Sequence, residues 1–187
     1  MGRVYCCIDL KSFFASVECV ERGLDPFKEN LVVADPDRGS GTICLAVSPA
    51  MKAAGVKNRC RVFEIPKNVR YITAKPRMKL YMEKSLQIYS VYLKFISPDD
   101  ILVYSIDECF IDLTDYVKLY GKTETELARL LVDAVYKETG IRAAAGVGTN
   151  MFLAKVALDI TAKHSADFMG YLDEEEFKKT IWRHRPI

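Results

Sequence analysis

Two adjacent acids, Asp107 and Glu108, lie between two apolar runs in the middle of the chain. The runs cover residues 101–104 and 110–113, and their alternation predicts a β-hairpin whose tight turn carries both acids. Repulsion between neighbouring carboxylates at the edge of a core is costly unless a cation lies close to them. An ordinary solvated turn also favours Asp, so these two acids alone leave both interpretations open.

A third acid near the start of the chain favours the cation site. The apolar run Val4–Ile8 predicts a buried strand that ends on Asp9, and residues 11–20 predict a helix directly after it. If this strand pairs beside the hairpin, Asp9 converges with the two acids of the turn. Three oxygen ligands without His or Cys suit Mg²⁺ or Mn²⁺, so the sequence predicts a divalent metal site.

Three blocks of sequence resemble the Y-family translesion DNA polymerases of the UmuC/DinB type. They are residues 8–18 (IDLKSFFASVE), residues 105–108 (SIDE) and residues 146–157, where GVGTN precedes LAKVA. The resemblance covers nearly the whole chain, and three ordered motifs are more specific than any one alone. It implies a DNA-directed DNA polymerase of the translesion, DNA damage bypass type. Such an enzyme transfers a nucleotide from a dNTP to a primer 3′-hydroxyl with two metal ions.

The resemblance also implies the fold class and the domains. The fold is α+β, with a ferredoxin-like palm (a split β-α-β motif), an inserted small fingers subdomain and the start of a thumb. The palm takes residues 1–22 and 76–165, the fingers 23–75, and a truncated thumb 166–187. The predicted palm elements follow β-α-β-β-α-β order, which places helices on one face of an antiparallel sheet and leaves the other face for substrate. The chain is expected to be a fragment with weak or no activity alone.

Apolar spacing and end signals predict the individual elements. Ser48 and Pro49 are expected to cap and begin one short helix. Thr123 and Glu126 form a capping-box pattern at the start of another. Helices are predicted at 11–20, 48–55, 76–96, 123–140, 151–162 and 173–182, and strands at 4–8, 31–34, 43–47, 101–104, 110–113 and 142–148.

The family resemblance implies a role for each acid. Asp9 and Asp107 would bridge two metal ions, and Glu108 would bind the catalytic ion. The backbone carbonyl of Leu10 would bind the ion on the nucleotide side. Mg²⁺ is the expected ion, in two copies, and Mn²⁺ can substitute for it.

Three further residues match positions that contact the nucleotide in the family. Phe14 resembles the steric gate, which packs under the deoxyribose where a 2′-hydroxyl would clash. Phe13 lies on the apolar stripe of its helix and is expected to be mainly core, with a contact to the nucleotide. Lys163 is the nearest match to the family's triphosphate lysine, one residue out of register. A solvated surface lysine is the alternative.

The short helix after residue 48 departs from the family's pattern. DinB-like members carry a Tyr and an Arg three residues apart there, where this chain has Pro49 and Lys52. Lys52 offers phosphate a point charge without the two-pronged grip of Arg. Ser48 offers a hydroxyl, which can instead cap the helix.

Composition restricts where and how such a protein works. The net charge is +2, from 27 basic and 25 acidic residues, so any contact with DNA must come from local clusters. The chain has no apolar run of about 20 residues and no signal-peptide pattern, which predicts a cytoplasmic protein without a membrane partner. Cysteines without a C-x-x-C pair predict buried free thiols. They are Cys6, Cys7, Cys19, Cys44, Cys60 and Cys109.

The expected partners are primer-template DNA, a dNTP and, through a C-terminal part that follows in the family, a sliding clamp. Two other functions are possible for such a chain. A palm-type nucleotide cyclase uses similar paired acids, but the fingers insertion and the Phe13–Phe14 pair argue against it. A catalytically silent nucleic-acid-binding subunit would not need all three acids, and all three are present.

Overall fold

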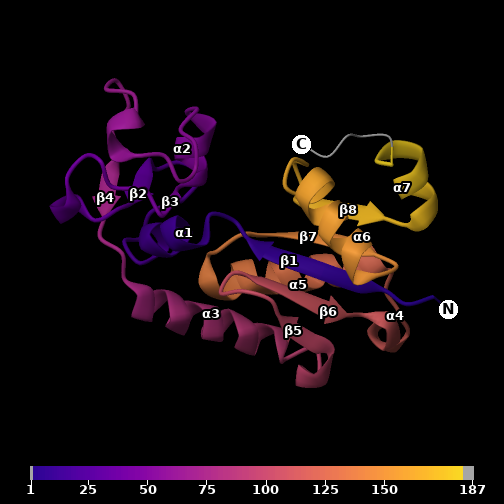
Figure 1. Ribbon diagram of the computed structural model, residues 1–187. Helices are drawn as coiled ribbons and strands as arrows, with labels where there is room; N and C mark the ends of the chain where they lie inside the picture. Colours follow the sequence, from indigo (N-terminus) through magenta and orange to yellow (C-terminus); the bar gives the residue numbers. More distant parts are fainter. Residues whose placement is uncertain (1, 183–187) are drawn as a thin grey trace. The chain divides into compact units, whose positions relative to one another are not determined.

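The computed structural model describes residues 2–182 and divides into two units. Unit 1 takes the described residues of Met1–Leu10, Ile88–Glu138 and Arg142–Ile187, and unit 2 takes Lys11–Gln87 and Thr139–Ile141. Each unit is described by itself below (Figure 1). Residues 183–187, the end of the predicted thumb, lie outside the described residues.

A five-stranded sheet in the order β5-β6-β1-β7-β8 forms the frame of unit 1. The central strand β1 (Tyr5–Leu10) is buried along most of its length and runs antiparallel to β6 (Glu108–Asp112) and β7 (Ala143–Gly148). The edge strand β5 (Ile101–Val103) pairs antiparallel with β6. The order β5-β6-β1-β7 is that of the ferredoxin-like motif, and the predicted α+β fold class is confirmed.

The other edge strand, β8 (Met169–Leu172), was not predicted. It runs parallel to β7, so the sheet is mixed and the prediction of an antiparallel sheet was incomplete. A parallel neighbour needs a crossover of a dozen or more residues, which the helical segment after β7 supplies. Gly170 allows that segment to lie against β8, since a Cβ there would lie 2.5 Å from the carbonyl oxygen of Ala157.

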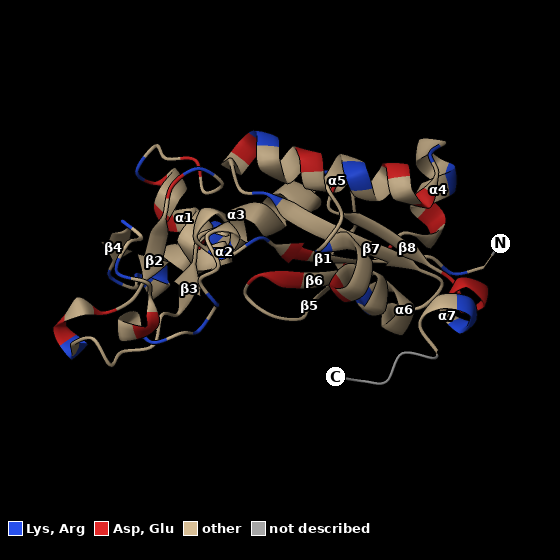
Figure 2. Ribbon diagram, turned by 90° about the horizontal axis from the view of Figure 1, so that it is seen from above, with Lys and Arg blue, Asp and Glu red and all other residues tan. Residues whose placement is uncertain are grey.

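Helices cover both faces of this sheet (Figure 2). Helix α5 (Glu124–Thr139) lies along one side, while α6 (Met151–Val156) and the π-helix η4 (Ala157–Ala162) lie along the other. The face expected to remain free for substrate is therefore partly covered. Small residues on the strands permit this close packing. The cluster contains Cys7, Phe110, Ala144, Ala154, Leu158 and Ala162.

The predicted helix starts in unit 1 agree with the observed caps. The Glu126 N–H donates to Thr123 Oγ1 at 3.3 Å and the Thr123 N–H donates to Glu126 Oε2 at 2.8 Å, which completes the capping box of α5. Helix α7 (Glu174–Thr180) begins after Asp173, whose carboxylate accepts from the Glu176 N–H at 2.8 Å. Helix α4 (Thr114–Tyr120) was not predicted.

Unit 2 contains a three-stranded sheet in the order β3-β2-β4. The central strand β2 (Leu31–Val33) pairs antiparallel with β3 (Ala46–Val47) and parallel with β4 (Ile72–Ala74). The prediction of a strand from residue 43 was too long, because Ile43 makes only an isolated bridge with Arg61. Strand β4 was not predicted, since its three residues, two exposed and one buried, are too few to show strand periodicity.

Two α-helices, α1 (Phe13–Val20) and α2 (Pro49–Ala53), lie wholly in unit 2, and α3 (Met78–Tyr92) lies mostly in it. The short 3₁₀ helices within residues 2–182 are η1 (Pro36–Arg38), η2 (Val62–Glu64) and η3 (Pro98–Asp100).

All six cysteines are free and buried, as predicted. Burial raises the pKa of the Cys19 thiol to about 11 and that of Cys109 to about 12, so these thiols remain protonated near neutral pH.

None of the described helices has the length and apolar character that a membrane crossing requires.

Candidate active site

Strand pairing in unit 1 brings the backbones of the three predicted acids together. Asp9 on β1 lies opposite Glu108 on β6, and the Leu10 N–H donates to the Asp107 carbonyl oxygen at 2.9 Å. Asp9 is two residues beyond Cys7, so it projects from the same face of the sheet, the face that α6 and η4 partly cover. The acids thus lie beside the helical segment that follows β7.

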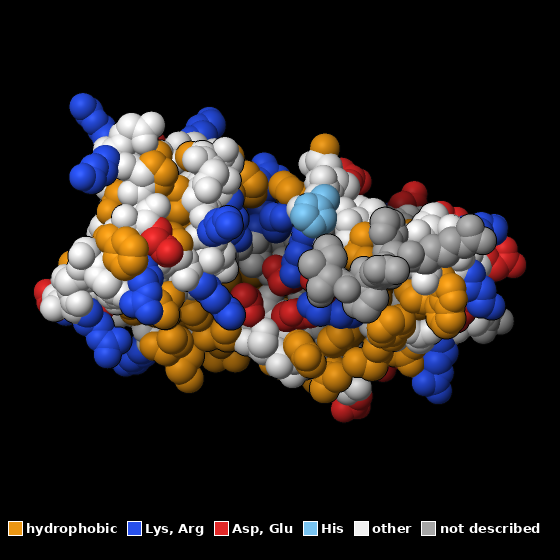
Figure 3. All heavy atoms as spheres, turned by 45° about the horizontal axis from the view of Figure 1, so that its top comes forward, with side chains coloured by type: hydrophobic (Ala, Val, Ile, Leu, Met, Phe, Trp, Pro, Cys, Tyr) orange, Lys and Arg blue, Asp and Glu red, His pale blue; other side chains and the backbone are white. Residues whose placement is uncertain are grey.

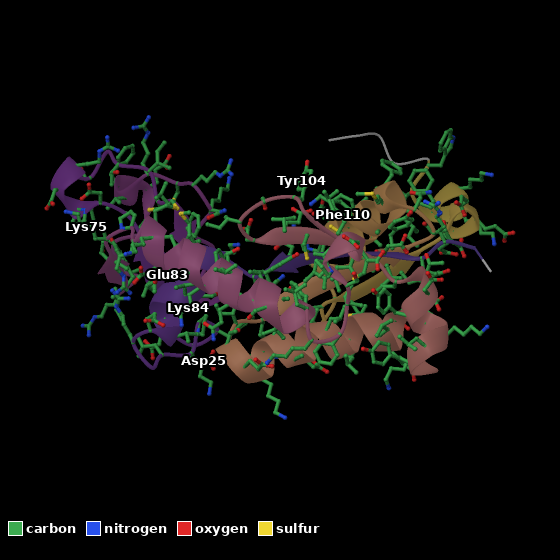
Figure 4. The ribbon with its side chains drawn as sticks, turned by 90° about the horizontal axis from the view of Figure 1, so that it is seen from below. Asp25, Lys75, Glu83, Lys84, Tyr104 and Phe110 are labelled. Carbon is green, nitrogen blue, oxygen red and sulfur yellow. The ribbon has the colours of Figure 1, made fainter. Side chains whose placement is uncertain are left out.

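The turn carries one acid rather than two. Glu108 is already the first residue of β6, because the N–H groups of Tyr104 and Ser105 both donate to its carbonyl oxygen at 3.0 Å. Asp107 stays in the turn and accepts a hydrogen bond from the Ser105 hydroxyl at 2.8 Å. Tyr104 extends from this turn and packs edge-on against Phe110, with 5.6 Å between ring centroids (Figure 4).

Two lysines of the helical segment neutralise two of the acids. Lys163 Nζ lies 2.8 Å from Asp9 Oδ2, and Lys155 Nζ lies 2.5 Å from Glu108 Oε1. Both lysines also contact Asp159, Lys163 at 2.8 Å and Lys155 at 3.2 Å. We call Asp9, Lys163, Asp159, Lys155 and Glu108, in this order, the charge chain.

The charge chain shifts the pKa values of its members. Burial raises the pKa of Asp9, against the opposing effect of Lys163. Burial would also raise the pKa of Asp159, but its hydrogen bonds with both lysines outweigh this effect and lower it. The same ion pairs raise the pKa of Lys155 despite its partial burial. Both lysines therefore remain cationic beside the acids.

The π-helix explains how Lys163 reaches Asp9. The Lys163 N–H donates to the carbonyl oxygen of Leu158, five residues earlier, at 3.0 Å. A π-turn accommodates one more residue than an α-turn. The predicted helix over 151–162 has the observed bounds, but its second half is π-helical, because backbone bonding changes from i+4 to i+5 after α6.

Two glycines on β7 allow the helical segment to approach. A Cβ on Gly148 would lie 2.5 Å from the backbone nitrogen of Ala154. A Cβ on Gly146 would lie 2.6 Å from Leu158 Cα and would also overlap the Leu158 backbone nitrogen. No side chain fits at either position, so these glycines set the distance from which the lysines reach the acids.

Three members of the site were missed from the sequence. The Cys7 thiol donates to Glu108 Oε1 at 3.2 Å, a contact without a local sequence signal. Lys155 and Asp159 did carry a local sequence signal, because opposite charges spaced four residues apart indicate mutual contact on a helix. That spacing continues to Lys163, so the lysine–acid–lysine series could have been recognised.

The donor set of the site fits a hard divalent cation, because the three predicted ligands offer carboxylate oxygens. Within residues 2–182, however, no group of three or more His, Cys, Asp or Glu side chains is arranged to hold a metal ion. Asp9 and Glu108 point instead to lysine ammonium groups. A cation would therefore have to compete with Lys155 and Lys163.

The remaining predicted nucleotide contacts lie in unit 2. Phe13 is 2% exposed and belongs to the core, whereas Phe14 is half-buried and stacks on Tyr81, with ring centroids 4.5 Å apart and planes at 18°. Lys52 is exposed on α2. Ser48 is fully buried, and its hydroxyl donates to the Glu29 carbonyl oxygen at 2.7 Å.

The Ser48 hydroxyl oxygen also accepts hydrogen bonds from two backbone N–H groups. It accepts from the Met51 N–H at 3.2 Å, as the predicted cap requires, and from the Leu31 N–H at 3.1 Å. These contacts match the capping role that the sequence offered as the alternative to nucleotide binding.

A buried carboxylate holds the ring beneath Phe14. Tyr81 donates its hydroxyl hydrogen to Glu18 Oε1 at 2.7 Å, and Glu18 is 0% exposed. Arg77 grips both carboxylate oxygens, at 3.0 and 2.7 Å, and Arg22 forms an additional ion pair. The fixed carboxylate orients Tyr81, and Tyr81 supports the Phe14 ring.

We expect Glu18→Gln to destabilise the chain by about 2 kcal/mol, because the buried network loses its negative charge and one of its two acceptor oxygens becomes an N–H₂ donor. Burial would raise the pKa of Glu18, but hydrogen bonds from Arg77, Tyr81 and Arg22 lower it below the ordinary value of 4.5. This carboxylate therefore stabilises the fold above pH 4.5, and the stabilisation is lost as the pH falls through the folded pKa. Urea unfolding between pH 7 and 3 measures both effects, with exposed Glu83→Gln as control. Equal pH profiles for wild type and Glu18→Gln would contradict this role.

The face shown in Figure 3 carries Lys and Arg side chains scattered among acidic and hydrophobic ones. No single basic band runs across that face. This mixture of charges agrees with the small net charge of +2.

Comparison with solved structures defines the class of protein first. The crystal structure of DinB from Sulfolobus solfataricus superposes with a TM-score of 0.76 at 25% identity, over 94% of this chain and 50% of that one. A Y-family DNA polymerase chimera gives the same TM-score, identity and coverage. The fold is that of the Y-family DNA polymerases, with a palm and an inserted fingers subdomain.

The sequence model of the impB/mucB/samB family matches residues 8–159, and the chain belongs to this family. It is 36% identical over 183 residues to DNA polymerase IV 2 of Halalkalibacterium halodurans, which covers 97% of this chain and 44% of that protein. The chain spans less than half the length of this relative and of two curated relatives from Bacillus subtilis that it also matches.

Proposed function

We propose that this chain is the palm and fingers part of a translesion-type DNA-directed DNA polymerase. Its reaction would be transfer of a nucleotide from a dNTP to the 3′-hydroxyl of a primer on template DNA. The observation that carries the proposal is the pairing of Asp9 with Glu108 across two central strands, with Asp107 hydrogen-bonded to the next residue of β1. The name of the relative from Halalkalibacterium halodurans, DNA polymerase IV 2, supports it.

The acids would hold two Mg²⁺ ions, or Mn²⁺ in their place. Asp9 and Asp107 would contact both ions, Glu108 the catalytic one, and the Leu10 carbonyl oxygen the one on the nucleotide side. When bound, the ions would lower the pKa of the primer hydroxyl and neutralise charge on the triphosphate. The chain itself contributes two carboxylates on paired strands and a third from the adjoining turn, which would position the reacting groups.

Cationic and aromatic side chains would bind the rest of the nucleotide. Lys163 and Lys52 would contact the triphosphate as point charges. Phe14, supported by Tyr81, would pack under the sugar, with Phe13 behind it. The fragment would act in the cytoplasm, and a sliding clamp would bind through a further part of the polymerase.

Metal-dependent nucleotide binding tests the proposal. We expect calorimetric titration of a dNTP into the 187-residue chain to show saturable binding with Mn²⁺ and none without it. Absence of binding with Mn²⁺ would contradict a nucleotide site in this chain. Formation of a cyclic product from ATP or GTP without DNA would favour a palm-type cyclase instead.

Sugar selection gives a separate prediction for Phe14. We expect Phe14→Ala to reduce the preference for a dNTP over the matching rNTP by at least about 10-fold, because the ring would no longer exclude a 2′-hydroxyl. Titration of both nucleotides with Mn²⁺ measures the ratio. Phe63→Ala is the control, since Phe63 is 63% exposed elsewhere in unit 2. An unchanged ratio in Phe14→Ala would remove Phe14 from the gate position.

A further inference from the structure

Asp159 is the central member of the charge chain. It accepts Lys163 Nζ at 2.8 Å and Lys155 Nζ at 3.2 Å, while the same two ammonium groups contact Asp9 and Glu108. Each lysine is thus shared between one acid of the candidate active site and Asp159. The side chain of Asp159 is 44% exposed, so it is an accessible carboxylate rather than a core ion pair.

We propose that Asp159 is a positioning residue that sets the affinity of the acids for divalent cations, by holding the two lysines that compete for those acids. The inference rests on the proposed function, because it takes Asp9, Asp107 and Glu108 as the cation site. It concerns a residue outside the expected metal ligands, which acts on the ion only through Lys155 and Lys163.

The competition follows from the contacts. An ammonium group within 2.8 Å of a carboxylate oxygen takes the place and the charge compensation that a divalent cation would supply. When a cation binds, Lys155 and Lys163 are repelled from it and must leave Asp9 and Glu108. Asp159 remains within their reach, since it lies four residues from each along the helical segment. It therefore keeps a partner for both lysines in the cation-bound state.

The net charge around the acids predicts whether each substitution weakens or strengthens cation binding. Asp9, Asp107, Glu108 and Asp159 carry four negative charges against two positive charges of Lys155 and Lys163, which leaves −2. Asp159→Asn changes this to −1 and removes the carboxylate that both lysines share with the acids. Lys155→Met changes it to −3 and frees Glu108. The first substitution should weaken cation binding, and the second should strengthen it.

The experiment measures Mn²⁺ affinity of the full 187-residue chain by titration calorimetry, without nucleotide or DNA. We expect about fivefold weaker binding for Asp159→Asn and about fivefold tighter binding for Lys155→Met, with both shifts smaller at high salt. Asp159→Glu should keep the wild-type affinity, because it keeps the negative charge. Asp133→Asn and Lys137→Met, exposed on α5, are the matched controls and should leave the affinity unchanged.

The opposite signs separate positioning from damage to the fold, since a disturbed structure would weaken binding in both variants. Equal Mn²⁺ affinity in wild type and Asp159→Asn, or weaker binding in Lys155→Met, would overturn the inference while the proposed metal site stands. If wild type does not bind Mn²⁺, or if Asp107→Ala binds it equally well, the acids are not the cation site. In that case the proposed metal site fails, and the inference fails with it.

Discussion

Asp107→Ala is expected to weaken Mn²⁺-dependent dNTP binding at least about 100-fold, without unfolding the chain. The carboxylate is half-buried in a turn, and its side-chain hydrogen bond is with Ser105 of the same turn at 2.8 Å. Removal of Asp107 also relieves repulsion, because burial raises the pKa of Asp9 and the charges of Asp107 and Glu108 raise it further. Function should therefore be lost while stability is kept.

Two measurements on the same sample separate these effects. Calorimetry with a dNTP and Mn²⁺ reports the site, and the thermal unfolding midpoint reports the fold, with exposed Asp133→Ala as control. A midpoint within about 3 °C of wild type together with lost binding is the expected result. A large drop in the midpoint would assign Asp107 a structural role. Full binding would exclude it from the site.

Gly146→Ala is expected to cost at least about 3 kcal/mol of unfolding free energy. The added Cβ would lie 2.6 Å from Leu158 Cα and would overlap backbone atoms of Ala154 and Leu158. The backbone atoms of a packed helix cannot shift to make room for the methyl group, whereas the end of a flexible side chain could. The helical segment that carries Lys155 and Lys163 must therefore move away from the sheet or unfold locally.

Urea unfolding measures the cost, and a second glycine provides the control. Gly41→Ala adds the same methyl group where no atom lies within 4 Å, so we expect wild-type stability for it within about 0.5 kcal/mol. If Gly146→Ala unfolded at the same urea concentration as wild type, close packing of the helical segment against Gly146 would not be required for stability. Because the lysines move with the helical segment, Gly146→Ala should also alter Mn²⁺ affinity.

Local signals in the sequence determined much of the framework. Ser48 before Pro49 and the Thr123–Glu126 capping box marked helix starts that the hydrogen bonds confirm. Apolar patterning identified the central strand, and the succession of predicted strands and helices along the chain gave the ferredoxin-like order. These features could be predicted because each depends on residues only a few positions apart.

The tertiary structure decided what depends on distant partners. Strands β4 and β8 are three and four residues long and exist only through pairing with β2 and β7. The π-helical turn depends on backbone bonding that charge or hydropathy patterns do not specify. It carries Lys163 to Asp9, while Lys155 reaches Glu108 from α6. The sequence by itself therefore determined which acids are available, and tertiary packing decided that two lysines neutralise them, because these ion pairs join residues 47 to 154 positions apart.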